Sequence, residues 1–230
     1  MTNQMGTAPD ATSEHGRQGR QSESLLQATE RTRQRYDRLA RVFDRMEAGV
    51  ESRRMHSWRA ALWEHVRGPR VLEVGVGTGK NIPYYREGWR ITAIDLAPRM
   101  LAQATRRADR EHARVELRLG DVQALPFPDA SFDTVVATFV FCSVPDPVLG
   151  LQEVLRVLVP GGQLLLLEHV LSRNPILGRI MNIANPVVVR MMGANINRET
   201  VRNAERAGFK LQRVDDLWRD IVKLIQAERL

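Results

Sequence analysis

From residue 68 to residue 168, short apolar runs alternate with segments whose apolar residues recur at helical spacing. The predicted strands are residues 70–74, 90–95, 114–119, 132–138 and 162–168, and the predicted helices between them are residues 81–86, 98–109 and 148–158. Strands separated by helices of this length favour parallel pairing, because each helix returns the chain across one face of the sheet. The alternation therefore predicts an α/β fold with a doubly wound, mostly parallel sheet and helices on both faces.

The pattern changes after the fifth predicted strand. Residues 171–197 form an apolar and basic insertion that proline interrupts, and helical spacing returns at residues 198–207. Residues 209–214 and 221–228 favour a closing antiparallel hairpin, although residues 218–230 also fit a helix. With the hairpin, the predicted sheet has seven strands.

The chain before the first strand divides into two parts. Residues 1–22 are polar, with hardly any large apolar side chain, so burial cannot compensate for ordering entropy and a disordered tail is predicted. Residues 23–66 carry apolar positions at helical spacings, with a break near Gly49, which predicts two or three amphipathic helices. These helices are expected to cap the core domain of residues 67–230, and either they only cover it or they also cover a substrate or contact lipid.

A glycine-rich turn, EVGVGTG at residues 73–79, follows the first strand. A phosphate-binding P-loop needs Gly-Lys followed by Ser or Thr, but Asn81 follows Lys80, and a dinucleotide fingerprint needs its third glycine where Lys80 stands. The turn still lets a ligand lie against the backbone, and Asp95 at the end of the second strand is placed to accept hydrogen bonds from a ribose diol. The pattern indicates a nucleoside-containing ligand, with a tight structural turn as the alternative.

Three further motifs follow the glycine turn in order. GDV at residues 120–122 comes after the third strand, FD at residues 132–133 opens the fourth, and LRVLVPGG at residues 155–162 precedes the fifth. As a set, over about residues 36–228, these motifs resemble the class I S-adenosylmethionine-dependent methyltransferases. The resemblance implies a seven-stranded, Rossmann-like methyltransferase fold, S-adenosyl-L-methionine as the cofactor and S-adenosyl-L-homocysteine as the product.

The same resemblance implies roles for individual residues. The glycine turn would pass close to the methionine part and the ribose, Asp95 would bind the ribose hydroxyls, Leu96 and Met100 would flank the adenine, and Asp121 with Val122 would meet its amino edge. Met100 alternatively belongs to a helix core, and Asp121 to a turn. The residues implied to bind the cofactor are Glu73, Gly75, Gly77, Gly79, Asp95, Leu96, Met100, Asp121, Val122 and Thr138.

A sulfonium cofactor already carries an activated methyl group, so the protein mainly has to align an acceptor and exclude water. Ligands of open parallel sheets lie at the carboxyl ends of the strands, where His169 follows the fifth strand. His169 is predicted to deprotonate the acceptor, or else to be a structural histidine at a strand end. Tyr36, with Tyr84 and Tyr85, is predicted to form an aromatic cage for a methylammonium group, although the latter two alternatively cover the cofactor or pack the first helix. Cys142 is predicted to be a packing residue.

Within the superfamily, the chain is similar to three groups of enzymes. Residues 35–40 (RYDRLA) and 121–127 (DVQALPF) resemble the quinone C-methyltransferase-like group and the bacterial phospholipid N-methyltransferases. Residues 141–144, 167–170 and 193–198 also resemble a thiol-methylating, membrane-associated animal branch. The resemblance implies a hydrophobic or lipid-borne acceptor. The leading hypothesis is N-methylation of phosphatidylethanolamine; the alternatives are C-methylation of a quinone precursor, S-methylation of a small thiol, and a non-enzymatic sensor or scaffold that binds the cofactor.

Charge favours an anionic partner. The net charge is +7, and between residues 170 and 198 arginines accompany apolar residues without any acidic residue. An apolar face edged by arginine suits peripheral contact with an anionic membrane, and a buried lid or a dimer surface is the alternative. No basic block alternates with aromatic residues, so nucleic acid is not an expected partner. The single cysteine, with no apparent signal peptide or spanning segment, predicts a cytoplasmic protein at the inner face of the membrane.

Overall fold

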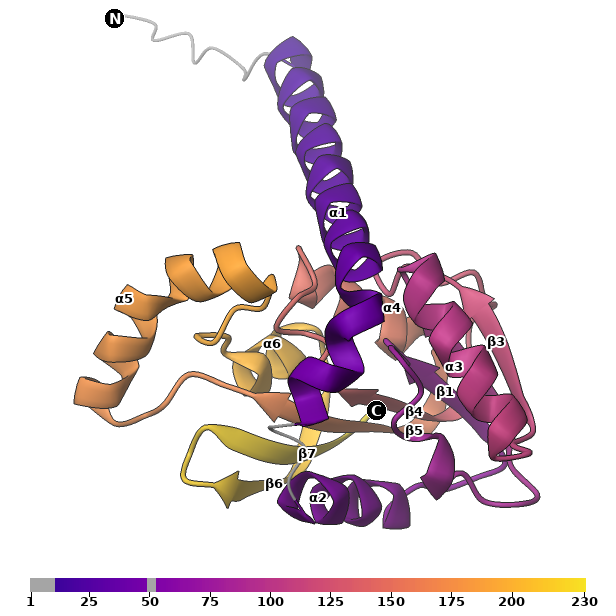
Figure 1. Cartoon of the computed structure of the whole chain (residues 1–230). Coiled ribbons are helices and arrows are strands. Elements are labelled where there is room, and N and C mark those ends of the chain that lie inside the picture. The colour runs from indigo at the N-terminus through magenta and orange to yellow at the C-terminus, as the bar shows by residue number, and fades with distance from the viewer. Residues whose placement is uncertain (1–10, 49–52) are drawn as a thin grey trace, which may run out of the picture.

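The computed structural model describes residues 11–48 and 53–230. Within them, seven strands form one sheet in the order β3-β2-β1-β4-β5-β7-β6 (Figure 1). The pairs among the first five strands are parallel, and β7 runs antiparallel to β5 and β6. The predicted fold class is confirmed. The strands are β1 (Arg70–Val74), β2 (Arg90–Asp95), β3 (Val115–Leu119), β4 (Phe132–Thr138), β5 (Leu158–His169), β6 (Lys210–Trp218) and β7 (Val222–Glu228).

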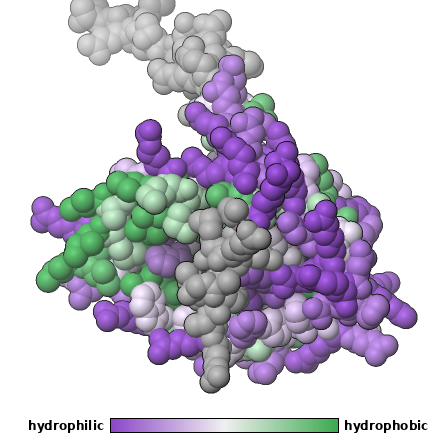
Figure 2. Space-filling model, viewed as in Figure 1, coloured by the Kyte–Doolittle hydropathy of each residue, from purple (hydrophilic) through white to green (hydrophobic). Residues whose placement is uncertain are grey.

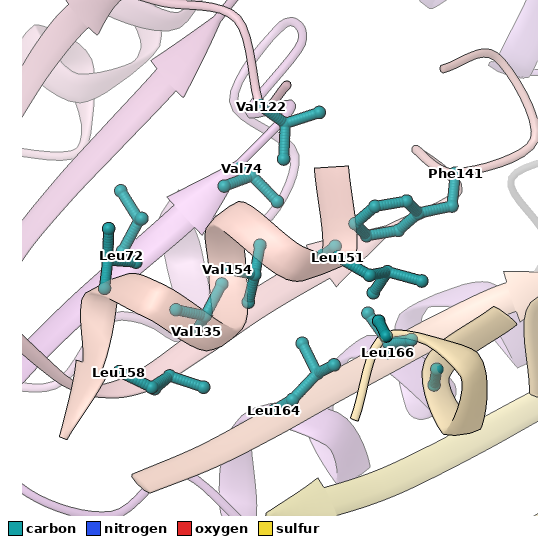
Figure 3. Packing of buried hydrophobic residues seen from close by; sticks show 14 of the residues in the cluster. Leu72, Val74, Val122, Val135, Phe141, Leu151, Val154, Leu158, Leu164 and Leu166 are labelled. Atoms are coloured by element: carbon teal, nitrogen blue, oxygen red, sulfur yellow. The ribbon is translucent and has the colours of Figure 1, made fainter. Parts of the chain in front are cut away.

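Helices cover both faces of this sheet. They are α1 (Ala11–Ala48), α2 (Arg53–Glu64), the 3-10 turn η1 (Ile82–Tyr84), α3 (Pro98–Arg110), α4 (Pro147–Val157), α5 (Pro175–Met192) and α6 (Thr200–Arg206). Because successive side chains of a strand point to opposite faces, Leu164 of β5 packs with Leu151 of α4, whereas the next residue, Leu165, packs with Trp63 of α2 (Figure 3 shows the first of these clusters). The sheet therefore lies between two helical layers, with α4 and α6 on one face and α2 and α3 on the other.

Most predicted elements coincide with observed ones. The predicted ranges 70–74, 90–95 and 132–138 match β1, β2 and β4 at both ends, and the predicted closing hairpin is β6 with β7. The alternative helix over residues 218–230 is wrong. Because β7 lies between β5 and β6 and is buried on both faces, its residues do not alternate between apolar and polar, which is why they also fitted a helix. The predicted helix at residues 81–86 is a single 3-10 turn.

The N-terminal helix is longer than predicted. Residues 11–22, which were predicted to belong to a disordered tail, are the first turns of α1, and residues 1–10 lie outside the described residues. Once a helix is nucleated, each added residue contributes one hydrogen bond for the backbone entropy that it loses, so a polar segment can continue a helix that has already formed. The predicted break near Gly49 also lies outside the described residues, between α1 and α2.

Two elements extend away from the sheet. Figure 1 shows α1 rising from the core and α5 at the periphery of the molecule. Toward its C-terminal end α1 meets the core, where Ala40 is buried with Ala97 and Met100. In the part of the chain that the structure describes, no helix is both long and apolar enough to cross a membrane.

Candidate active site

A cavity of about 450 Å³ opens at the carboxyl ends of the parallel strands. It lies between those strand ends, α1 and the segment that ends α5. Every residue predicted from the sequence to bind cofactor or acceptor lines it except Gly79, Tyr84 and Tyr85. The lining residues among them are Tyr36, Glu73, Gly75, Gly77, Asp95, Leu96, Met100, Asp121, Val122, Thr138 and His169. The strand topology thus brings together residues at the ends of five strands, and α1 adds Tyr36.

The glycines of the turn after β1 have different surroundings. Gly75, Gly77 and Gly79 all have positive φ, which favours glycine. A Cβ at Gly75 would lie 2.5 Å from a methyl of Val140, and one at Gly79 would lie 2.6 Å from Ile82, so both positions are small for packing reasons. A Cβ at Gly77 would meet nothing within 4 Å. Gly77 therefore leaves backbone open to the cavity, as a bound nucleoside requires.

The Asp95 carboxylate connects this turn to the end of β2. One oxygen accepts from the backbone N–H of Gly77 at 2.8 Å and the other from Ala97 at 2.8 Å. Burial raises the pKa of Asp95 to about 6, against the effect of these two hydrogen bonds. An ionised carboxylate has about four acceptor sites, so both oxygens can still accept from a ligand diol.

A hydrogen-bond network lies under the other end of the turn. The Asn81 amide donates to Glu73 Oε1 and to Thr138 Oγ1, each at 2.9 Å, and accepts from the Arg59 guanidinium at 2.9 Å. Tyr85 donates its hydroxyl to the second oxygen of Glu73. Burial raises the pKa of Glu73 to about 7. Arg59 also lines the cavity, so a guanidinium and a carboxyl group face the same region.

Asp121 and Met100 have structural contacts as well as positions at the cavity. The Asp121 carboxylate accepts from the backbone N–H of Gln123 at 2.9 Å, as in a turn, and from its side-chain amide at 3.1 Å. Met100 is 1% exposed and packs with Ala40 and Ala97. Both residues therefore have the structural contacts of the second alternative and also line the cavity, and their contacts with the cofactor stay predictions.

His169 lies at the end of β5. Burial lowers its pKa, so the imidazole is neutral at pH 7. Its Nδ1 is buried and has no hydrogen-bond partner among residues 11–48 and 53–230. His169 also lines the cavity, where a neutral imidazole can take up a proton from a ligand.

The aromatic residues at the cavity differ from the predicted cage. Tyr36 packs edge to face on Phe43 with ring centroids 6.3 Å apart, and its hydroxyl is paired with Ser143. Tyr84 and Tyr85 do not line the cavity, so the cage that included them is wrong. The short η1 turn directs both toward α2, where Tyr85 packs on Trp63 with centroids 4.9 Å apart and Tyr84 is hydrogen-bonded to His56.

Cys142 is a buried cavity residue with a protonated thiol. Burial raises the pKa of Cys142 to about 12, which leaves almost no thiolate at neutral pH. The thiol therefore behaves as a small apolar group, in agreement with the predicted packing role.

Several lining residues were not singled out from the sequence. They come from α1, α2, the turn before η1, the loop after β4 and the α5 region. Apolar spacing in the helices indicates a buried face but not the cavity that it covers. They include Leu39, Phe43, Arg59, Asn81, Ser143, Val188, Met192, Asn195 and Ile196.

The family described as a methyltransferase domain matches residues 72–166. A phosphatidylethanolamine N-methyltransferase of Cereibacter sphaeroides is 42% identical over 113 residues, which cover 48% of this chain and 56% of that protein, little more than half its length. A demethylmenaquinone methyltransferase of Clavibacter sepedonicus is 31% identical over 191 residues, covering 80% of this chain and 78% of the relative. A mouse thiol S-methyltransferase is 34% identical over 145 residues, covering 60% and 59% respectively.

Solved structures share the fold at lower identity. A SAM-dependent methyltransferase of Thermotoga maritima aligns with a TM-score of 0.65 and 20% identity, covering 86% of this chain and all of that one. A SAM-dependent methyltransferase of Methanosarcina mazei aligns with a TM-score of 0.61 and 23% identity, covering 74% of this chain and 97% of the other.

Proposed function

Because the chain belongs to the class I S-adenosylmethionine-dependent methyltransferases, in the quinone C-methyltransferase-like group, we propose that it methylates a hydrophobic, membrane-borne acceptor, with phosphatidylethanolamine as the leading candidate. The chain is an enzyme of this class, and its cofactor is S-adenosylmethionine. When bound, that cofactor supplies an electrophilic methyl group on a sulfonium. The acceptor is the part of the activity that we propose.

The residues around Gly77 fit the nucleoside part of the cofactor. Gly77 offers uncovered backbone, and Asp95 offers carboxylate lone pairs for the ribose diol. Leu96 and Met100 provide apolar contacts for the adenine, and Asp121 provides an acceptor for its amino group.

The Glu73 and Arg59 side chains fit the amino-acid part. A free amino acid carries an ammonium and a carboxylate, and the carboxyl of Glu73 and the guanidinium of Arg59 match these two charges. Asn81 is hydrogen-bonded to both side chains and so fixes their relative positions. A bound ammonium would keep Glu73 ionised in spite of its burial.

The apolar wall of the cavity is the observation that carries the choice of a hydrophobic acceptor. Beyond the polar residues around Glu73 and Asp95, the lining is formed by aliphatic and aromatic side chains from α1, β4 with the loop after it, and the α5 region. They are Leu39, Phe43, Phe139, Val140, Val144, Val188, Met192, Ala194 and Ile196. A wall of this composition binds an apolar molecule and excludes water from the reacting groups.

The remaining polar and aromatic residues suit methylation of an amine. Neutral His169 can take up the proton that a primary ammonium must lose before its nitrogen acts as a nucleophile. The aromatic rings of Tyr36 and Phe43 at the cavity favour the methylammonium charge that remains in the product. The Phe139 ring instead faces the Arg59 guanidinium at 6.0 Å. The phenol of Tyr36 stays protonated, because burial raises its pKa.

Peripheral contact with the inner face of the membrane is part of this proposal. Phosphatidylethanolamine carries two acyl chains and stays in the bilayer, so its headgroup has to be reached at the membrane surface. The net charge of +7 favours approach to a surface that also contains anionic lipids.

Demethylmenaquinone is the second candidate acceptor. Its support is the length of the similarity, since the relative from Clavibacter sepedonicus is covered over 78% of its length, against 56% for the phosphatidylethanolamine enzyme. Its ring and isoprenoid tail would also occupy an apolar cavity, and His169 would then take a proton from a ring hydroxyl.

The deciding assay offers the acceptors side by side. Purified chain, with S-adenosylmethionine labelled in the methyl group, is incubated with vesicles containing phosphatidylethanolamine, with vesicles containing demethylmenaquinone in its reduced form, or with an alkyl thiol. We expect label in monomethylated phosphatidylethanolamine. Label only in the quinone or the thiol, or no labelled product from a chain that binds S-adenosylhomocysteine in calorimetry, would overturn the leading proposal.

A further inference from the structure

The α5 helix presents a row of large apolar side chains to solvent. Ile176, Ile180, Ile183, Val187 and Met191, which we term the apolar face of α5, are between 56% and 73% exposed. Their spacings of four, three, four and four residues put them on one side of the helix. Figure 2 shows this surface as a continuous hydrophobic patch on a molecule whose surface in this view is otherwise mostly hydrophilic. Soluble proteins rarely expose contiguous apolar area of this kind unless it binds something.

The helix is fixed at both ends without burying that face. Asn174 caps the first turn by accepting from the N–H groups of Ile176 and Leu177 at 3.0 and 3.1 Å, and Gly193 ends the helix in the left-handed conformation. Within α5 only Gly178 and Met181 are buried. The exposed row therefore belongs to a well-formed helix that lies on the surface of the core (Figure 1).

Basic residues accompany the apolar face. Arg179 and Arg190 lie on the helix and are exposed; Arg173, which precedes it, is also exposed but forms an ion pair with Asp216 at 2.8 Å. Since no acidic residue occurs between residues 170 and 198 and the whole chain carries +7, a second copy of this chain would bring like charges together. Anionic lipid headgroups match the arginines, and the acyl region beneath them matches the apolar row.

The same helix forms part of the cavity wall. Val188 and Met192 line the cavity, and Met192 is at the same time 52% exposed. The C-terminal half of α5 thus connects the apolar face with the proposed acceptor site.

We propose that the apolar face of α5 docks this chain in the plane of an anionic lipid bilayer and that an acceptor enters the cavity along the C-terminal half of α5. The inference rests on the proposed function in one respect, that the acceptor is membrane-borne. In this arrangement the acceptor passes from the bilayer to the cavity between Val188 and Met192 without crossing bulk water.

Vesicle sedimentation with the full chain tests the docking. The vesicles consist of phosphatidylcholine alone or of phosphatidylcholine with phosphatidylglycerol, and contain neither proposed acceptor. We expect wild type to bind the anionic vesicles at least tenfold more tightly than the neutral ones. The affinity for anionic vesicles should fall at least tenfold in each of the double variants Ile183→Glu/Val187→Glu and Arg179→Glu/Arg190→Glu. Their helical circular dichroism and their S-adenosylhomocysteine binding should stay unchanged.

Two matched controls change comparable surface residues outside α5. Leu119→Glu alters a side chain on β3 that is 54% exposed, and Arg106→Glu/Arg206→Glu changes the net charge by the same amount as the arginine variant of α5. Both should bind vesicles far better than the α5 variants.

Three outcomes would overturn the inference. In the first, the α5 variants bind anionic vesicles as tightly as wild type; in the second, the control variants lose as much vesicle affinity as the α5 variants. In the third, wild type is a dimer in sedimentation velocity, and Ile183→Glu/Val187→Glu dissociates the dimer without changing vesicle binding. The proposed function fails separately: a chain that binds these vesicles but methylates no lipid retains the docking, and a chain that methylates detergent-dispersed phosphatidylethanolamine without binding vesicles retains only the activity.

Discussion

Asp95 illustrates how one side chain can hold two backbone segments together and still line a cavity. Its two oxygens hold the glycine turn and the backbone before α3 through Gly77 and Ala97, while the carboxylate remains at the cavity. The sequence indicated this residue because an acid at the end of β2 follows the glycine turn at the spacing found in nucleotide folds. It could not indicate the two backbone contacts, since they depend on how the loops close.

Replacing Asp95 tests its proposed contact with the ribose. Charge-assisted hydrogen bonds contribute about 1.5–3 kcal/mol each, so Asp95→Asn should raise the dissociation constant of S-adenosylhomocysteine at least roughly tenfold at pH 8. Since the pKa of Asp95 is about 6, wild-type affinity should fall as the pH drops below that value, and the variant should lack this step. Calorimetry between pH 5 and 8 measures both effects. Asp109→Asn, at an exposed position, is the control, and equal affinity of Asp95→Asn and wild type at pH 8 would refute the contact.

Arg59 is a residue that the sequence did not indicate, because it comes from α2 and reaches Asn81 only in the folded chain. If its guanidinium binds the cofactor carboxylate, Arg59→Met should weaken the binding of S-adenosylhomocysteine about tenfold or more. The binding of 5′-methylthioadenosine, which lacks the amino-acid part, should stay unchanged. Isothermal titration with both ligands separates the two parts. Arg54→Met, exposed on the same helix, should change neither constant. Equal weakening of both ligands by Arg59→Met would instead indicate a purely structural role through Asn81.

Glu168 makes folding stability depend on pH. Its Oε1 accepts from the N–H groups of Val140 and Phe141 at 2.8 and 3.0 Å, but Oε2 is buried and unpaired within the described chain. Burial raises its pKa from 4.5 to about 7, so the folded state binds the proton more tightly than the unfolded state does. The resulting stabilisation is fully present below about pH 4.5 and is lost as the pH rises through 7.

Glu168→Gln, which is neutral at every pH, should therefore gain stability relative to wild type as the pH rises. From the size of the shift, the difference in the free energy of unfolding should change by about 3 kcal/mol between pH 5 and pH 8. Urea unfolding without ligand at the two pH values provides the measurement. The exposed-site variant Glu87→Gln should keep a constant difference from wild type, and a constant difference for Glu168→Gln would contradict the assignment.

At the scale of elements, the sequence predicted best where the chain is most regular. β1, β2 and β4 are short apolar runs bounded by turn residues, and they lie next to one another in the middle of the sheet. Their carboxyl ends consequently identified the cofactor side of the cavity. Among the helices at the cavity, α1 and α2 were predicted as helices, with Tyr36 of α1 as a site residue, whereas α5 was predicted only as a proline-interrupted apolar and basic insertion. Apolar spacing shows that a face is buried and not what it is buried against, so the other lining residues of these helices were not predicted.

The contacts of α1 with the core lead to an expectation about how a ligand affects the motion of this helix. Its contacts with the core include a hydrogen bond from Gln123 to Thr29 at 3.0 Å and one from the Arg99 N–H to Asp37 at 2.9 Å. Because residues of α1 line the cavity, a bound ligand should stabilise the packed position of the helix, by up to about 2.7 kcal/mol at a hundredfold excess over the dissociation constant.

Hydrogen exchange followed by mass spectrometry tests this coupling. We expect S-adenosylhomocysteine to slow exchange of the amides of residues 32–43 and to leave those of residues 176–183, in the outer half of α5, unchanged. Identical exchange of residues 32–43 with and without ligand would show that α1 opens and closes independently of the cofactor site.

At the scale of the whole molecule, the cofactor side and the acceptor side have different origins. The cofactor side is built from the strand ends, which the chain shares with folds at about 20% identity. The proposed acceptor side is built from α1 and the segment around α5, which do not belong to the sheet. Relatives that act on phosphatidylethanolamine, demethylmenaquinone and thiols resemble this chain to a similar degree. The cofactor was therefore predictable from motifs, whereas the acceptor depends on the elements around the sheet.

Net charge and the apolar face of α5 should make separable contributions to membrane binding. The charge of +7 acts through solvent and is screened with a Debye length of about 10 Å at 0.1 M salt and about 3 Å at 1 M, whereas burial of apolar side chains in lipid is not weakened by salt. Binding of wild type to anionic vesicles should thus fall between 0.1 and 1 M sodium chloride but persist at a level that does not depend on lipid charge. Ile183→Glu/Val187→Glu should lose this residual binding, while Arg179→Glu/Arg190→Glu should retain it and show a smaller dependence on salt. If wild type and the apolar-face variant converged at 1 M salt, contact would be electrostatic alone, and α5 would not enter the bilayer.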